Sequence, residues 1–292
     1  MMQRDKVVGA VMLTIAASIW GGMFVVVKSI VGQIPPVQLV WFRYSIAAVV
    51  MLLVALAQRI KWHWRKKDVL LIILMGVVGY ALSSTAQETG TWLSSAQLGA
   101  VVTASTPAFM VVFNWTILKV HPSTGDWVSL ALAMLGIICI VGLQFSGRQL
   151  LLGALSLLVS GIAWALMSAL VRLVSPDVSM LQVTLCSTVV AIICLTPWSL
   201  MHWRAVAGVN FGRPAVFLRL SYLGIVSTAM GFMLWNDGLR RMRSNVSGLF
   251  FLFQPVVGAL LGWLILGEGL TIGFFLGLAL LFASIWVAMR WA

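Results

Sequence analysis

Charge is scarce in this sequence, and that scarcity excludes most soluble folds. Asp, Glu, Lys and Arg make up 9% of the 292 residues, whereas 61% of the residues are hydrophobic. A soluble domain carries charge on about a quarter of its residues, because its surface must face water. Most of this chain therefore faces something other than water, and the sequence predicts a protein whose solvent is the lipid bilayer.

Cysteine and histidine are also rare, with three of each. All three cysteines lie inside apolar runs, which excludes a disulfide framework and the spacing of a structural metal site. The histidines lie at the ends of different apolar runs, so they do not form the polar cluster that a membrane enzyme acting on lipid would need. We therefore expect no cofactor and no metal, and an enzyme is only a remote alternative.

Acidic residues number only seven against 19 Lys and Arg, which gives a net charge of +12. A basic surplus can indicate nucleic-acid binding, but these basic residues lie in short loops between apolar runs. With the N-terminus inside, thirteen Lys and Arg fall on the inner side and five on the outer side. The positive-inside rule then places both termini in the cytoplasm. We expect no nucleic-acid partner and a location in a bacterial-type inner (plasma) membrane.

Long apolar runs fill the rest of the chain. A helix needs roughly 20 apolar residues to cross about 30 Å of hydrocarbon, and in lipid each crossing segment must satisfy its own backbone hydrogen bonds. The sequence therefore predicts an all-α polytopic membrane protein of ten transmembrane helices. The expected segments are 7–30, 37–58, 69–89, 95–118, 127–145, 151–173, 180–202, 214–237, 245–267 and 270–290.

An internal repeat relates the two halves of the chain, residues 1–147 and 148–292. At an offset of 144 residues, the matched pairs are Gly9–Gly153, Trp20–Trp164, Lys28–Arg172 and Gln38–Gln182. At an offset of 148 residues, the pairs are Gly76–Gly224, Gly90–Gly238, Pro107–Pro255 and Trp115–Trp263. Each half has five helices, and five is an odd number, so the second half must run through the bilayer inverted relative to the first.

Inverted repeats place a substrate site near the midplane, where the two halves meet. The polar and aromatic residues at the centres of the segments are therefore the candidates for a substrate-binding cavity. They are Trp20, Tyr80, Ser83, Ser84, Thr106, Trp164, Ser227, Thr228 and Gln254. The alternative for each Ser and Thr is a hydrogen bond within its own helix, which lets two helices approach closely. Trp20 and Trp164 lie too deep to be interfacial tryptophans.

Prolines and charges within the segments are the remaining candidates. Pro107 and Pro255 are expected to kink their helices, which suits either a gate or a static bend. Glu88 is the best candidate for a coupling or mouth charge on the outer side, and its alternative is a solvated carboxylate at a helix end. We expect no Lys or Arg at the midplane, which favours a substrate with little net charge and disfavours phosphate-bearing ones.

Several motifs resemble those of the ten-helix EamA-type exporters of the drug/metabolite transporter superfamily, and among them the YddG-like amino-acid exporters. The motifs are Trp20-Gly21-Gly22-Met23-Phe24 followed by Lys28, then Arg43-Tyr44, Pro107, and Pro255 followed by Gly267-Glu268. The resemblance implies a basket-like arrangement around a central cavity and export of amino acids or related metabolites from the cytoplasm. One departure is that Val120 stands in the first half where the second half has Glu268.

The leading hypothesis is therefore a monomeric carrier that exports aromatic or other neutral amino acids, or related small metabolites, by alternating access. The alternative within the carriers is efflux of lipophilic cations. Small multidrug exporters of the same superfamily use a carboxylate in their first helix, and here the first and sixth segments contain no acid. A channel is disfavoured because no filter motif is present. The sequence leaves open whether transport is coupled to protons.

Overall fold

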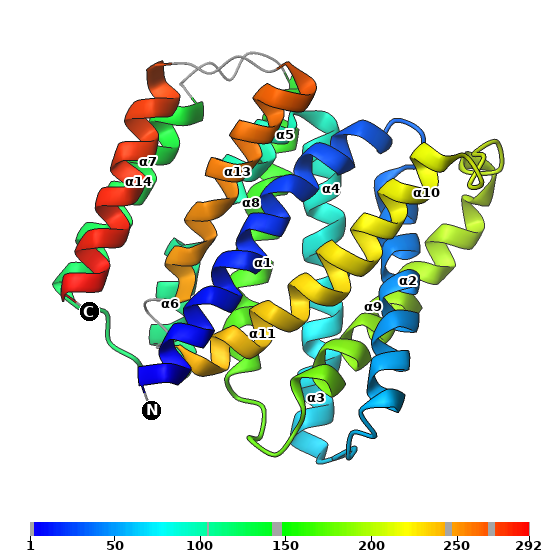
Figure 1. The fold of residues 1–292 in the computed structure, drawn as a ribbon, viewed down its shortest axis with the longest axis horizontal. Helices are drawn as coiled ribbons and strands as arrows, with labels where there is room; N and C mark the ends of the chain where they lie inside the picture. The colour runs from blue at the N-terminus through cyan, green and yellow to red at the C-terminus, as the bar shows by residue number, and fades with distance from the viewer. Residues whose placement is uncertain (1–2, 104, 142–147, 243–246, 268–271, 292) are drawn as a thin grey trace.

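A computed structural model describes residues 3–103, 105–141, 148–242, 247–267 and 272–291 (Figure 1). The elements of the first half are α1 Gln3–Ile30, α2 Pro36–Ala57, α3 Lys66–Leu74, η1 Met75–Leu82, α4 Ser83–Leu93, α5 Ala96–Thr103, α6 Thr106–Leu118 and α7 Thr124–Val141. The elements of the second half are α8 Arg148–Val171, α9 Met180–Met201, η2 Trp203–Ala205, α10 Pro214–Ser221, η3 Tyr222–Met230, α11 Gly231–Arg241, η4 Gly248–Leu252, α13 Phe253–Leu261, η5 Gly262–Leu266 and α14 Ile272–Trp291.

The described residues form helices and connecting loops, with no strand among them. Within these residues, seven helical stretches are long and apolar enough to cross a membrane, and Thr106–Leu118 and Ile272–Ser284 are shorter apolar helices. This confirms an all-helical protein that crosses the membrane several times. Lengths alone do not establish ten crossings, so that number stays a prediction. Glu268, which the sequence placed in the last hairpin, lies outside the described residues.

The helices pack as a bundle in which α1 lies between α13 and α11, and α4 lies against α8 (Figure 1). The pair α7 and α14 stands at one edge of the bundle, and both chain ends lie on the same side of the view. The centre of the bundle is thus bordered by α1, α4, α8, α11 and α13. Helices from both halves of the sequence therefore meet there.

The segment expected at 95–118 is not one kinked helix but two, α5 and α6. Pro107 lies in the first turn of α6, where a backbone N–H would have no partner within the helix. Pro255 lies similarly, in the first turn of α13 directly after the 3₁₀ turn η4. Pro107 and Pro255 thus lie near the starts of helices and not in the interiors where bends were expected, because proline fits the start of a helix better than its middle.

Three segments contain a wide π-helical stretch that the sequence did not indicate: η5 in the second half, and a matched pair. The matched pair is η1, between α3 and α4, and η3, between α10 and α11. Adding 148 to the residue numbers of η1 gives nearly the bounds of η3, Tyr222–Met230. Wide helical turns of this kind are often found at functional sites. Tyr80 lies in η1, and Ser227 and Thr228 lie in η3, so the wide turns hold three of the predicted site residues.

Matched glycines bring equivalent helices into close contact. A Cβ on Gly76 would lie 2.6 Å from Cβ of Val190 on α9, and a Cβ on Gly224 would lie 2.6 Å from Cβ of Ile46 on α2. The two glycines are 148 residues apart, and their partners are 144 residues apart. The same two offsets that relate the sequences therefore relate these contacts in space.

A second set of glycines behaves in the same way. A Cβ on Gly90 would lie 2.8 Å from the carbonyl oxygen of Gly153, and one on Gly238 would lie 3.3 Å from the carbonyl oxygen of Gly9. Small residues at such crossings let two helix backbones approach, and the resulting van der Waals packing helps to hold helices together in lipid.

Candidate functional site

A cavity lies at the centre of the bundle, and residues from both halves of the chain line it. It is narrow in this conformation, with a volume of about 20 Å³, which is room for about one water molecule. The lining residues are Trp20, Met23, Arg43, Ser83, Ser84, Gln87, Thr103, Thr106, Ser160, Gly161, Trp164, Phe232, Phe251 and Gln254. Six of the nine residues predicted for the cavity are among them, namely Trp20, Ser83, Ser84, Thr106, Trp164 and Gln254.

The other three predicted residues lie directly behind the lining. The ring of Tyr80 contacts that of Trp164, with centroids 6.1 Å apart. The backbone oxygen of Ser227 accepts a hydrogen bond from Trp20 Nε1 at 2.9 Å. The hydroxyl of Thr228 accepts one from Arg43 Nε, also at 2.9 Å. These three residues therefore position lining side chains, and none of them lines the cavity itself.

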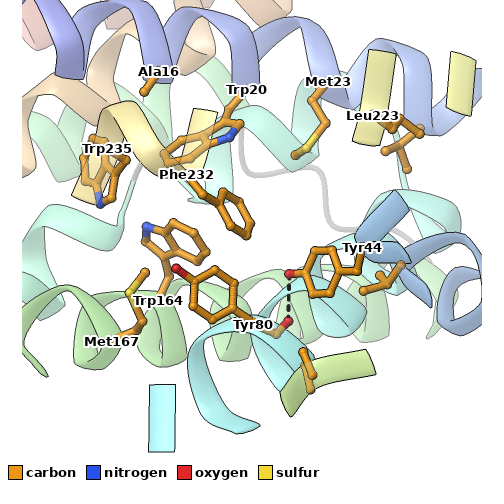
Figure 2. Close-up of a cluster of buried hydrophobic side chains, with 14 of the residues drawn as sticks. Ala16, Trp20, Met23, Tyr44, Tyr80, Trp164, Met167, Leu223, Phe232 and Trp235 are labelled. Atoms are coloured by element: carbon orange, nitrogen blue, oxygen red, sulfur yellow. Dashed lines mark hydrogen bonds between the residues drawn. The ribbon is translucent and has the colours of Figure 1, made fainter. Parts of the chain in front are cut away.

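One wall of the cavity is aromatic (Figure 2). The rings of Trp20 and Trp164 meet edge to face, with centroids 5.2 Å apart, and Phe232 lies 5.0 Å from Trp164. Phe251 stacks on Trp20 with centroids 5.9 Å apart. Offset and edge-to-face contacts of this kind are the favoured geometries for aromatic pairs. The wall is therefore a fixed aromatic surface on which an apolar group can pack.

The two tryptophans differ in their hydrogen bonding. The indole N–H of Trp20 is bonded to the backbone of Ser227, whereas Trp164 Nε1 is buried and has no acceptor among the described residues. A buried donor without a partner costs about 1–3 kcal/mol. Since Trp164 borders the cavity, its N–H is a candidate donor to a bound ligand.

The polar wall of the cavity is formed by hydroxyl, amide and guanidinium groups, and three of them come from the first turns of α4. Ser83, Ser84 and Gln87 line the cavity from this helix, and Gln87 shares their face because it lies four residues after Ser83 and three after Ser84. The hydroxyl of Ser83 donates to the backbone oxygen of Ser160 at 2.9 Å, and that of Ser84 lies 2.6 Å from Tyr44 Oη. The residue Gln87 was not in the predicted set, although it lies on the same helix face.

A charged pair lies at this wall, which corrects the expectation that the centre holds no Lys or Arg. Arg43 lines the cavity, and its Nη1 lies 2.7 Å from Oε1 of Glu88. Glu88 is 0% exposed and Arg43 1% exposed, so Glu88 is not a solvated carboxylate at an outer mouth. The position of each residue along its own helix suggested a place near a membrane surface. Packing α2 against α4 buries both side chains, and the rule that charges inside spans pair with each other could have found them.

The aromatic residues Phe232 and Phe251 were also missed by the sequence reasoning, although a signal was present. At the offset of 148, Phe232 corresponds to the predicted Ser84, and Phe251 corresponds to Thr103. The prolines flank the lining, because Pro107 follows Thr106 and Pro255 follows Gln254. Among the described residues, no three His, Cys, Asp or Glu side chains lie close enough together to hold a metal ion.

Comparisons with known proteins show which family this chain belongs to. The sequence pattern of the EamA-like transporter family matches the chain twice, over residues 7–142 and 151–290. The uncharacterized transporter YetK of Bacillus subtilis (strain 168) is 25% identical over 292 residues, which cover 97% of this chain and 88% of YetK. An uncharacterized transporter of Archaeoglobus fulgidus is 24% identical and covers 96% of this chain and 98% of its own length. A protein of known crystal structure shares the fold, with a TM-score of 0.79 at 16% identity over 97% of this chain and 99% of its own. The chain belongs to the EamA-like transporter family of the drug/metabolite transporter superfamily and is a multi-pass membrane transporter.

Proposed function

We propose that this transporter exports aromatic or other neutral amino acids, or closely related small metabolites, from the cytoplasm. The observation that supports this most is the division of the cavity into an aromatic wall and a polar wall. An amino acid has the same division, because a charged backbone carries a side chain that is often apolar. It can therefore contact both walls at once, as ligands do in sites that combine apolar lining with a few polar groups.

The charges at the cavity support a ligand with little net charge. Arg43 and Glu88 neutralise each other, so the described lining adds no net charge. A phosphate-bearing metabolite would need unpaired cationic side chains. A lipophilic cation would need an unpaired anion, but Glu88 is held by Arg43 at 2.7 Å. Efflux of such cations is therefore the weaker candidate and becomes an outcome of the experiment.

The proposed mechanism is alternating access by a monomer with ten transmembrane helices in an inner membrane. Residues 1–147 and 148–292 form two inverted halves, and both termini are cytoplasmic. The paired glycine contacts and the double match to the family pattern support this arrangement. The halves rock about the cavity, with the helix breaks beside Pro107 and Pro255 as the flexing points. Glu88 is a candidate coupling group because it is an ionisable group buried beside the cavity.

Transport by the purified protein in liposomes tests this proposal. We expect efflux of at least one radiolabelled neutral amino acid, measured across a panel with and without a pH gradient. Replacing Phe232 with Leu keeps an apolar side chain but removes the ring, so affinity for aromatic amino acids should fall about 2–10-fold while that for aliphatic ones is unchanged. Phe275, exposed on α14, provides the matched control, and Phe275→Leu should change neither.

Two outcomes would contradict the proposed function. Efflux of organic cations without movement of any amino acid would replace it with the drug-efflux alternative. Equal losses for aromatic and aliphatic amino acids in Phe232→Leu would show that the aromatic wall supports the fold and does not contact the side chain of the substrate. A dependence of efflux on the pH gradient would identify proton coupling.

A further inference from the structure

The ion pair between Arg43 and Glu88 is incomplete on both sides. One guanidinium nitrogen, Nη1, contacts one carboxylate oxygen, Oε1, and Nε is bonded to Thr228. No described residue accepts a hydrogen bond from Nη2 of Arg43, and Oε2 of Glu88 is buried without a donor. Arginine and a carboxylate can form two parallel hydrogen bonds, and this pair forms only one. Each partner therefore keeps capacity for another charged group.

The fold itself does not require charge at these positions. At the offsets of 144 and 148 residues, Arg43 corresponds to Ser187 and Glu88 to Asn236. The hydroxyl of Ser187 donates to the backbone of Ile72, and the amide of Asn236 donates to the hydroxyls of Tyr80 and Thr184. The second half thus uses neutral groups in the corresponding places.

Burying two charges inside a membrane protein costs free energy, so their presence needs an explanation other than packing. An ionisable residue in a membrane span is unfavourable, and such residues usually mark substrate or ion pathways. A buried ion pair is also weak support for stability, since apolar residues of similar volume often do as well. The neutral counterparts in the second half show that this fold can do without the pair. The charges are therefore better explained by a ligand than by packing.

We infer that Arg43 anchors the carboxylate of a zwitterionic substrate, and that Glu88 is the counter-ion that holds the guanidinium while the cavity is empty. This rests on the proposed function and deepens it, because it limits the ligands to molecules with a free α-carboxylate and an α-ammonium. The carboxylate takes Nη2 and competes with Glu88 for Nη1. The ammonium, one carbon away, then comes within reach of the released carboxylate of Glu88.

The charge balance explains why a zwitterion is preferred over its relatives. The pair and a zwitterion together contain two positive and two negative groups, arranged so that each lies beside its opposite. A simple carboxylate would leave one buried negative charge without a partner. An amine, or an amino acid whose carboxylate is converted to an amide, would leave one positive charge without a partner. Uncompensated buried charge is strongly unfavourable, so both relatives should bind less well than the amino acid.

A double variant and three related ligands test the inference. Arg43→Gln with Glu88→Gln removes both charges together, so neither is left buried alone. The ligands are L-phenylalanine, its primary amide and 3-phenylpropionate, each measured as a competitor of labelled amino-acid uptake in proteoliposomes. In the wild type, L-phenylalanine should compete about 10–100-fold better than either relative, since hydrogen bonds to charged groups are strong. In the double variant this preference should shrink to within about 3-fold.

The matched control neutralises an ion pair outside the cavity. Arg241 and Asp237 pair at 3.0 Å on the partly exposed face of α11. The double variant Arg241→Gln with Asp237→Asn should keep the full preference for L-phenylalanine. Thermal unfolding and size-exclusion profiles of every variant separate a loss of folding from a loss of recognition.

Each result has a defined meaning. If the cavity double variant keeps the preference for a free carboxylate, Arg43 is not the anchor, although the proposed function stands. If that variant does not fold, the wild-type protein still tests the inference. Equal competition by L-phenylalanine and its amide for labelled amino-acid uptake would overturn it. If the wild type moves no amino acid at all, the proposed function and the anchor fail together.

Discussion

The helices α4 and α11 are separated by 148 residues in sequence and follow π-helical stretches that match, yet their faces toward the cavity differ in chemistry. Where α4 has Ser84 and Glu88, α11 has Phe232 and Asn236. Gly90 and Gly238, further along the same helices, both meet glycine-containing helices at short range. The residues that set the helix crossings are thus kept, while those that face the centre differ. A duplicated framework therefore supports a cavity with one polar and one aromatic wall.

Removing the charge of Arg43 from the polar wall should have the largest effect on stability. Arg43→Ala leaves Glu88 buried without its counter-ion, so we expect a loss of stability of about 3–5 kcal/mol. Asn236→Ala, at the position that corresponds to Glu88, removes only neutral hydrogen bonds and should cost about 1–3 kcal/mol. Thermal and denaturant unfolding in detergent compares the two. Adding Glu88→Gln to Arg43→Ala should restore part of the stability, because it removes the unpaired charge. Equal losses of stability in Arg43→Ala and Asn236→Ala would contradict the prediction that the buried charge makes the difference.

Filling the matched glycines should affect both halves alike, with an intermediate effect. The new methyl group in Gly76→Ala or Gly224→Ala would lie 2.6 Å from a β-branched side chain of the neighbouring helix. Overpacking of this kind costs about 1–3 kcal/mol, and we expect the two losses to agree within about 0.5 kcal/mol. Gly208→Ala is the control, because nothing lies within 4 Å of its Cβ position. Losses that differ widely would show that the two crossings are not equivalent.

Exchanging the tryptophans for phenylalanine should have the smallest effect on stability and should separate two roles. Trp20→Phe breaks the hydrogen bond to Ser227 and should cost about 0.5–1.5 kcal/mol. Trp164→Phe removes a buried donor without a partner and should leave unfolding unchanged or raise the midpoint. If the free indole N–H of Trp164 bonds the substrate, transport affinity should nevertheless fall in Trp164→Phe. Equal destabilisation by both substitutions would contradict the difference between the two indoles.

The candidate cavity was partly predictable, and what was missed follows a physical rule. Trp20 and Trp164 were found because a repeat offset and depth within a segment are both visible in sequence. Arg43 and Glu88 were predicted to lie nearer the membrane surface, because the position of a residue along one helix does not show which neighbouring helix covers its side chain. The break before Pro107 was taken for a bend, because proline disfavours a helix interior without indicating on which side the helix restarts.

The sequence alone determined a membrane protein of apolar helices with an internal repeat, because both depend on composition and spacing along the chain. Resemblance in its motifs also led to the family that the comparisons then established. Only the tertiary structure decided that Arg43 meets Glu88, that Trp20 meets Trp164, and that polar and aromatic residues line one cavity. Those contacts join residues from 45 to 144 positions apart. They are set by the close crossings of helices, and a pattern read along one helix does not contain the identity of the helix packed against it.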